Sequence, residues 1–343
     1  MKALVLTSNN CLEFVDVREP EIGPDDVLVR VSACGICGSD VHGMDGSSGR
    51  RIPPVIMGHE AAGTVADTGN LVRDWKPGQR VTFDSTVYCG KCRYCRQGLV
   101  NLCDNRRVLG VSCDDYRQEG AFAEYLAVPG RILYPLPDGV SFVQGATVEP
   151  LSIAVHAVSL ARPGPDSATV VIGCGVIGLL IIQVLRALGT LRVIAVDVDP
   201  YRLQRAVEMG AEASIRSDRD DPALTIASLT SGRGADVVFE AVGVNPTVNL
   251  ATDVTRKGGT VVLVGNITPV VDLPLQKVVT RQLTINGSAA SCGEYPVAIG
   301  LIADGRVKVD AIVSAVAPLR DGPEWFARLR RGGEPLLKVV LEP

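Results

Sequence analysis

A glycine-rich turn between two apolar stretches, at residues 169–188, constrains the fold of this chain more than any other feature. Residues 170–178 read V-V-I-G-C-G-V-I-G, and short Val/Ile-rich runs then alternate with stretches of helical character. Strands are expected at residues 169–172, 192–196, 236–240, 260–264 and 282–287, and helices at residues 175–188, 200–209 and 245–255. Continuous apolar strands alternating with helices predict a doubly wound α/β domain, whose parallel sheet is covered on both faces.

The glycines of this turn match the G-x-G-x-x-G fingerprint of dinucleotide-binding (Rossmann) domains. Gly173 permits the tight turn, Gly175 lets the backbone approach a pyrophosphate, and Gly178 lets helix and strand pack closely. The helix that opens with Val176 and Ile177 offers free N–H groups to phosphates. The sequence therefore predicts a dinucleotide cofactor at this turn.

An acidic residue indicates which dinucleotide is bound. Asp197 lies 19 residues beyond Gly178, at the end of the next expected strand. Its carboxylate would accept hydrogen bonds from the adenosine ribose and repel a 2′-phosphate, so NAD is favoured over NADP. Arg202 could pair with such a phosphate, but we expect it to be a solvated helix residue that covers the adenine.

The rest of the chain has a different character. The first 135 residues contain short β-rich runs separated by Gly/Pro/Asp turns, and a helical pattern covers residues 145–161. A length of 343 residues fits two domains, and a net charge of −4 offers no field for nucleic acid or an anionic membrane. No signal peptide or membrane span stands out, so we expect a cytoplasmic protein whose thiols are reduced.

Four of the ten cysteines form a compact C-x2-C-x2-C-x7-C cluster: Cys89, Cys92, Cys95 and Cys103. Four thiolates at this spacing close a tetrahedron around one Zn²⁺ and leave no position for a substrate, which predicts a structural zinc. The cluster does not match the ferredoxin pattern of iron–sulfur proteins. A nucleic-acid finger is a further reading of this basic loop, although a partner finger is missing.

A second set of candidate ligands is smaller. Cys37 lies in C-G-S-D-V-H, and His59 and Glu60 are adjacent in G-H-E. A Cys, a His and a carboxylate can form a zinc shell with an open position, as catalysis requires. The third ligand is Glu60 or an acid from elsewhere, of which Glu149 in V-E-P-L is the best candidate. This set predicts a catalytic zinc that lowers the pKa of a bound alcohol or water.

Together these residues resemble the zinc-containing medium-chain alcohol dehydrogenases, in particular the sorbitol (polyol) dehydrogenase branch, bacterial type. The resemblance covers essentially the whole chain, through G-I-C-G-S-D-V-H (35–42), M-G-H-E-A-A-G (57–63), the four-Cys lobe, A-T-V-E-P-L (146–151) and the glycine turn. It implies a GroES-like β-barrel catalytic domain at residues 1–148 and 288–343, carrying the zinc lobe (89–103). The Rossmann NAD-binding domain would span residues 149–287.

The resemblance also implies roles for single residues. Cys37 and His59 would bind the catalytic zinc, with Glu60 or Glu149 completing the shell. Asp40 would orient His59, and Ser39 and His42 would relay the substrate proton. The nicotinamide end of the cofactor would be lined by Val264, Gly265, Asn266, Gly287, Ser288 and Ala289, and Val242 would also bind the cofactor.

The implied function is hydride transfer from a polyol or sugar-like secondary alcohol to NAD, with two zinc ions per chain in a homodimer or homotetramer. Animal sorbitol dehydrogenases have an Arg-Tyr pair where this chain has Ala290 and Ser291, so the substrate stays open. A sugar phosphate such as galactitol 1-phosphate, a cyclitol or aminocyclitol, and threonine are alternatives. Further possibilities are a zinc-free reductase and a structural protein that merely retains NAD.

Overall fold

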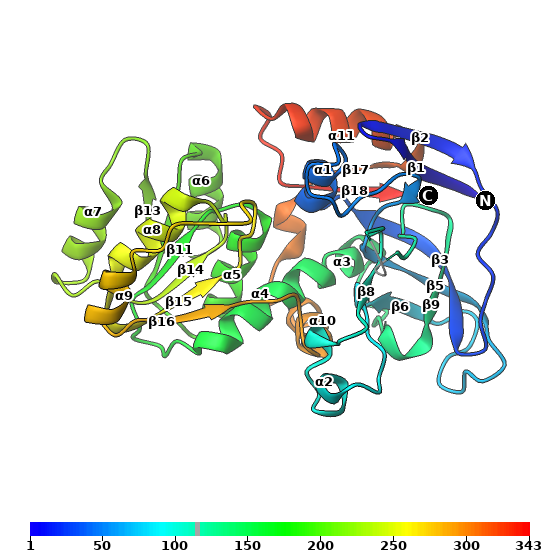
Figure 1. Ribbon diagram of the computed structural model, residues 1–343, viewed down its shortest axis with the longest axis horizontal. Coiled ribbons are helices and arrows are strands. Elements are labelled where there is room, and N and C mark those ends of the chain that lie inside the picture. Colours follow the sequence, from blue (N-terminus) through cyan, green and yellow to red (C-terminus); the bar gives the residue numbers. More distant parts are fainter. Residues whose placement is uncertain (114–116) are drawn as a thin grey trace. The chain divides into compact units, whose positions relative to one another are not determined.

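The computed structural model describes residues 1–113 and 117–343, and the chain forms two compact units (Figure 1). The first unit contains Met1–Glu149, Tyr295–Ala303 and Val309–Pro343, and the second contains Pro150–Glu294 and Asp304–Lys308. The second unit is therefore an insertion within the first. This division places residues 288–294 with the second unit, whereas the resemblance places them with the first domain.

The second unit contains a six-stranded sheet in which every strand pair is parallel, in the order β13-β12-β11-β14-β15-β16. The chain starts at β11 in the centre and returns to its other side at β14, so the strand order reverses between these two strands. Dinucleotides bind at such a switch point, outside the carboxyl ends of the strands. The strands are β11 (Thr169–Ile172), β12 (Val193–Asp197), β13 (Ala213–Arg216), β14 (Ala235–Glu240), β15 (Thr255–Leu263) and β16 (Thr284–Gly287).

Helices connect these strands, and the sequence shows where several of them begin. In both α6 and α7 an Asp-Pro pair opens the helix: Asp199 and Asp221 accept backbone N–H groups of the first turn through their side chains. Val170, Ile172 and Val238 of the sheet are almost fully buried in the core of this unit. Burial of each such side chain contributes about 1.5–3 kcal/mol to the free energy of folding. The helices are α4 (Val148–Ala161), which begins in the first unit, α5 (Val176–Ala187), α6 (Pro200–Glu208), α7 (Pro222–Leu229), α8 (Asn245–Val254) and α9 (Leu275–Thr280).

The first unit is built mainly from antiparallel strands. One sheet has the order β2-β1-β4, and a larger one has the order β10-β6-β5-β3-β18-β17 with β9 also paired to β3. The last strand of the chain pairs with β3, where Val340 faces Gly35 and Leu341 faces Cys34. The strands are β1 (Lys2–Ser8), β2 (Cys11–Asp16), β3 (Asp26–Gly35), β4 (Val55–Ile56), β5 (Glu60–Thr68), β6 (Arg80–Phe83), β7 (Thr86–Val87), β8 (Arg107–Val108), β9 (Tyr125–Pro129), β10 (Leu133–Pro135), β17 (Val313–Pro318) and β18 (Lys338–Glu342).

The first unit also contains short helices: α1 (Gly38–Gly43), α2 (Arg93–Arg96), α3 (Phe142–Ala146), α10 (Tyr295–Ala303) and α11 (Gly322–Arg331). Across the described residues, no helix combines the length and the hydropathy needed to span a membrane.

Candidate metal centres and dinucleotide site

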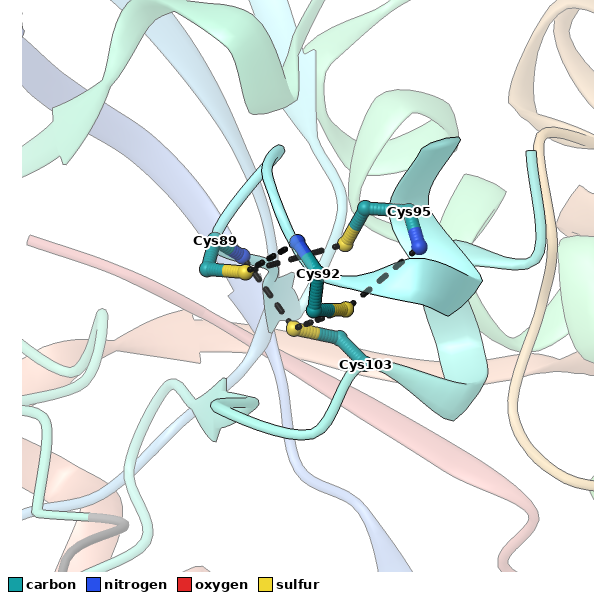
Figure 2. A group of neighbouring side chains, drawn as sticks. All are labelled: Cys89, Cys92, Cys95 and Cys103. Atoms are coloured by element: carbon teal, nitrogen blue, oxygen red, sulfur yellow. Dashed lines mark hydrogen bonds between the residues drawn. The ribbon is translucent and has the colours of Figure 1, made fainter. Parts of the chain in front are cut away.

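The four cysteines of the predicted structural zinc site converge in the loop between β7 and β8 (Figure 2). The Sγ atoms of Cys89 and Cys95 are 4.0 Å apart, and those of Cys92 and Cys103 are 3.9 Å apart. Zn–S bonds of about 2.3 Å require an S–S edge of about 3.8 Å in a tetrahedron. None of the four is in a disulfide. The thiols are therefore already arranged around the volume of one zinc ion.

Backbone N–H groups prepare these thiols to act as thiolates. The amide of Cys92 donates to Cys89 Sγ at 3.3 Å, and that of Cys89 donates to Cys103 Sγ at 3.2 Å. The N–H of Lys91 is the largest cause that lowers the pKa of Cys89 to about 6. Burial raises the pKa of Cys95 to about 12. Only the thiolate form of cysteine binds metal, and these four sulfur atoms fit zinc. Zinc binding would change protonation most at Cys95, because the raised pKa keeps this thiol protonated in the absence of metal.

The second candidate centre brings together Cys37, His59 and Glu60, whose ligand atoms all lie within 4.8 Å of one another. Cys37 caps the N-terminus of α1, and its Sγ accepts from the Oγ of Ser39 at 3.3 Å. His59 and Glu60 are buried at the start of β5. A sulfur, an imidazole and a carboxylate at this separation fit the donor chemistry of zinc, with a coordination position to spare.

A buried carboxylate orients the histidine. Asp40 is fully buried, and its Oδ1 lies 3.5 Å from His59 Nδ1 and 2.8 Å from the Nη2 of Arg51. Burial alone would raise the pKa of Asp40, but His59 and Arg51 hold it well below its usual range. With Nδ1 directed at Asp40, Nε2 is the nitrogen that His59 has left for a metal. This is the carboxylate–histidine arrangement common to zinc sites, completed by an arginine that the sequence did not reveal.

Lys338 also belongs to this centre, and sequence reasoning missed it. Its buried Nζ donates to Glu60 Oε2 at 2.5 Å and to the carbonyl of Ile36 at 3.0 Å. A Cβ at Gly35 would lie 2.5 Å from Glu60 Oε2, so the glycine makes room for the pair. The signal was a single cationic residue in the otherwise apolar run K-V-V-L of the last strand. Lys338 neutralises Glu60 where it stands next to Cys37 and His59.

Glu149, the other candidate ligand, lies outside this group of three. It is buried near the start of α4, and its Oε1 accepts from Ser85 Oγ at 3.0 Å. Burial raises the pKa of Glu149 to about 7, with the charge of Glu60 acting in the same direction and His59 opposing it. The structure thus places one acid among the candidate ligands and a second within their electrostatic reach.

The two residues of the expected proton relay, Ser39 and His42, are exposed on α1. They are three residues apart and therefore neighbours on one helix face. Ser39 contacts Cys37, whereas His42 lies in the last turn, so this face leads from the candidate zinc ligand toward solvent.

The glycine turn has the geometry that its sequence predicts. Gly173 has φ +90°, and a Cβ there would lie 2.4 Å from Val242 Cγ2. A Cβ at Gly178 would be 1.8 Å from the carbonyl oxygen of Gly173, which only glycine permits. A Cβ at Gly175 would have no neighbour within 4 Å among the described residues. That open space precedes Val176 and Ile177, the first residues of α5, whose N-terminus has no side-chain cap. The turn therefore fits a dinucleotide pyrophosphate.

Asp197 ends β12 next to this turn, and backbone amides hold both of its carboxylate oxygens. Oδ2 accepts from the N–H of Cys174 at 2.6 Å, and Oδ1 accepts from the N–H of Asp199 at 2.9 Å. A carboxylate has about four acceptor positions, so Asp197 can still accept from a ribose hydroxyl. Arg202 is about half exposed and pairs with Asp199 at 3.6 Å.

The remaining residues predicted to bind the cofactor follow neighbouring strands of the sheet. Val242 follows β14, Val264–Asn266 follow β15, and Ser288 and Ala289 follow β16. Glu240, Leu263 and Gly287 are in register across these strands, so the three loops emerge at one edge. This edge is the carboxyl end of the sheet, next to the glycine turn.

Comparison with known proteins identifies both units. Residues 23–138 match the alcohol dehydrogenase GroES-like domain, and residues 176–304 match the zinc-binding dehydrogenase family. A probable D-xylulose reductase A of Emericella nidulans is 34% identical, over 96% of this chain and 93% of the relative. The D-arabitol-phosphate dehydrogenase of Enterococcus avium is 33% identical, over 96% and 94%.

A solved structure supports the same conclusion across the full length. A zinc-binding dehydrogenase from Sinorhizobium meliloti 1021, bound to NADP, superimposes with a TM-score of 0.91 at 36% identity, covering 100% of this chain and 99% of the other. The resemblance seen in the sequence and the expected α/β fold class are thereby confirmed. The chain belongs to the zinc-containing medium-chain alcohol dehydrogenases, in their polyol dehydrogenase-like branch, and is an NAD(P)-dependent alcohol dehydrogenase.

Proposed function

We propose that this enzyme oxidises a secondary alcohol of a polyol or sugar-like substrate, with NAD as the hydride acceptor and a zinc ion at Cys37, His59 and Glu60 or Glu149. The carrying observation is the group Cys37–His59–Glu60, whose ligand atoms lie within 4.8 Å of one another, with His59 and Glu60 buried and Asp40 behind the histidine. Zinc held there supplies a Lewis acid that brings the pKa of a bound alcohol toward neutral. NAD supplies the acceptor for the carbon-bound hydride.

The chain's own residues move the proton and hold the charge. The Oγ of Ser39 accepts the proton of the alcohol, and His42 passes it to solvent along the exposed face of α1. Asp40 lies 3.5 Å from Nδ1 of His59, an arrangement that would leave Nε2 to hold the metal. Lys338 balances the charge of Glu60 next to Cys37 and His59, and Glu149 would offer a second carboxylate. The Cys89–Cys103 lobe would hold the second, structural zinc.

Two cysteine variants test the catalytic centre. Cys37→Ser should reduce the zinc content by about one ion per chain and abolish NAD reduction with every alcohol tried. Cys11→Ser, on strand β2 far along the chain from the candidate ligands, is the matched control and should change neither. Unchanged turnover in Cys37→Ser would remove the catalytic zinc from the proposal.

The preference for NAD rests on Asp197. Its carboxylate is fixed at the end of β12 by two amides, so it cannot turn away from a 2′-phosphate at low cost. The Sinorhizobium meliloti relative was solved with NADP, so the preference needs a direct measurement. We expect a higher kcat/KM with NAD than with NADP, and Asp197→Ala should reduce that ratio. An unchanged ratio would contradict this role of Asp197.

The substrate is best sought among sugar alcohols. The relatives' names point to a pentulose and to a phosphorylated pentitol. Ala290 and Ser291 are small where animal sorbitol dehydrogenases have Arg and Tyr, so a different recognition of the polyol chain is expected. A screen of polyols, their phosphates, cyclitols and threonine, followed by nicotinamide absorbance, separates these candidates. Sedimentation of the same preparation tests the expected homodimer or homotetramer.

A further inference from the structure

Glu240 is a buried acid at the end of β14 that the proposed mechanism does not use. It is fully buried, and its Oε1 accepts the N–H groups of Val242 at 3.0 Å and Gly243 at 2.8 Å. Its Oε2 is also buried and has no hydrogen-bond partner among the described residues. Burial of a carboxylate lowers the stability of the folded protein unless hydrogen bonds or an opposite charge compensate for the lost water. The position of Glu240 therefore needs an explanation.

The bonded amides belong to a crowded turn. A Cβ at Gly173 would meet Val242 Cγ2 at 2.4 Å, and a Cβ at Gly265 would meet the backbone of Val242 at 2.2 Å. Gly243 has φ +84°, and a Cβ there would lie 2.3 Å from backbone atoms of Gly265 and Asn266. Val242 thus lies in close contact with both the phosphate-binding turn and the loop that follows β15. A displacement of Val242 toward either segment would press on it.

The main-chain carbonyl of Glu240 also binds the segment that follows the next strand, β15. It accepts the N–H groups of Val264 at 2.8 Å and Gly265 at 3.0 Å. Side chain and main chain of one residue therefore fix the turns after β14 and β15. β14 adjoins β11 at the point where the strand order reverses, which is where a dinucleotide lies in such folds.

We propose that Glu240 is a positioning residue for the dinucleotide: its carboxylate holds the turn at Val242 and Gly243 so that the segments around Gly173 and Gly265 present a preformed surface to the cofactor. The proposal rests on the dinucleotide binding of the proposed function. It depends on the reach of Oε1 more than on the charge, because two amides converge on that single oxygen.

Reach and charge can be separated by two conservative variants. Glu240→Asp keeps the charge but withdraws the oxygens by one methylene, so both amides lose their acceptor. Glu240→Gln keeps an oxygen at the same distance and loses only the charge. We expect the dissociation constant for NADH to rise about tenfold in Glu240→Asp and about threefold or less in Glu240→Gln. A role of the charge alone predicts the opposite order.

Thr230→Val is the matched control at the other end of the same strand. The buried Thr230 accepts the N–H of Gly234, just before β14, through its Oγ1 at 2.9 Å. Thr230→Val removes this bond and the bond that the hydroxyl donates to the carbonyl of Ile226 at 2.7 Å, both at the end of β14 opposite the carboxyl edge. We expect lower thermal stability for Thr230→Val but unchanged NADH affinity.

The experiment is a fluorescence titration of each zinc-loaded variant with NADH, together with thermal unfolding and hydrogen exchange of residues 241–243. Weaker binding and faster exchange in Glu240→Asp, with Glu240→Gln close to wild type, support the proposal. It is overturned if Glu240→Asp binds NADH like wild type, if Glu240→Gln is the weaker binder, or if Thr230→Val loses affinity to the same extent. A wild-type protein that binds neither NADH nor NADPH would instead refute the proposed function, and this inference with it.

Discussion

Two glycines of the phosphate-binding turn should respond in opposite ways to the same added methyl group. A Cβ at Gly178 would lie 1.8 Å from the carbonyl oxygen of Gly173, and it must move to at least about 3.0 Å before the contact is tolerable. An alanine inside a helix gains about 1 kcal/mol in intrinsic propensity over glycine. Overpacking of this kind costs about 1–3 kcal/mol and more where backbone must shift, so the clash prevails. Gly178→Ala should therefore lose about 2 kcal/mol in the free energy of unfolding.

Gly175→Ala should leave stability almost unchanged and damage binding instead. Gly175 has φ −69°, which alanine adopts freely, and its added Cβ meets no described atom within 4 Å. Alanine lowers the conformational entropy of the unfolded chain, which stabilises the protein, but it is a poorer N-cap than glycine. The two effects nearly cancel, so we expect the free energy of unfolding to change by no more than about 0.5 kcal/mol. The methyl group would occupy the space into which the pyrophosphate approaches, so NADH affinity should fall at least about tenfold, or 1.4 kcal/mol.

Thermal unfolding and NADH titration of both variants provide the measurement. We expect a destabilised Gly178→Ala protein and a stable Gly175→Ala protein that binds NADH poorly. A Gly175→Ala protein with wild-type affinity, or a Gly178→Ala protein as stable as wild type, would refute this expectation.

Three further predictions concern Lys338 and Cys92 of the first unit and the Glu294–His156 pair of the second. Lys338→Met leaves the buried Glu60 without its counter-charge and should cost about 3–5 kcal/mol in chemical denaturation, whereas Lys338→Arg should retain most of the stability; equal losses would contradict the pairing. Cys92→Ser should release about one zinc ion per chain in elemental analysis and lower the melting temperature, while a variant with unchanged zinc content would show that the lobe binds none. Burial alone would raise the pKa of Glu294, but hydrogen bonds from His156 and the N–H of Cys292 lower it below its ordinary value of 4.5. The stability that Glu294→Gln loses should thus be present above pH 4.5 and vanish as the pH falls through the lowered pKa; a pH-independent difference in denaturation would speak against it.

The parallel-sheet unit could be predicted from the sequence because its signals are local. The apolar runs at β11, β12 and β14 and the Asp-Pro start of α6 determine their local structure within a few residues. The helix expected at residues 145–161 is in fact two helices, α3 and α4, separated at Thr147, because Ser141 and Gln144 form a capping box that begins α3 earlier. β13, α7 and α9 were not predicted.

The candidate catalytic centre shows where such reasoning ends. Cys37 and His59 could be named from short motifs, but Glu60 could not be chosen over Glu149 without knowing which acid points at them. Arg51 and Lys338 escaped because their partners, Asp40 and Glu60, are brought to them only by tertiary folding. An ion pair between residues far apart in the chain has no characteristic sequence spacing by which it could be recognised.

The pairing of the last strand with β3 has a consequence for how this protein is made. Glu60 and Lys338 are 278 residues apart, and ribosomes add about 5–20 residues per second, so Glu60 is synthesised roughly 15–55 s before its partner. The inserted unit ends at Lys308 and can form during that interval, while the surrounding unit still lacks β18. The first unit therefore begins to be synthesised before the inserted unit but can be completed only after it. A nascent chain interrupted before Lys338 would contain the complete inserted unit, but its buried Glu60 would lack the counter-charge of Lys338.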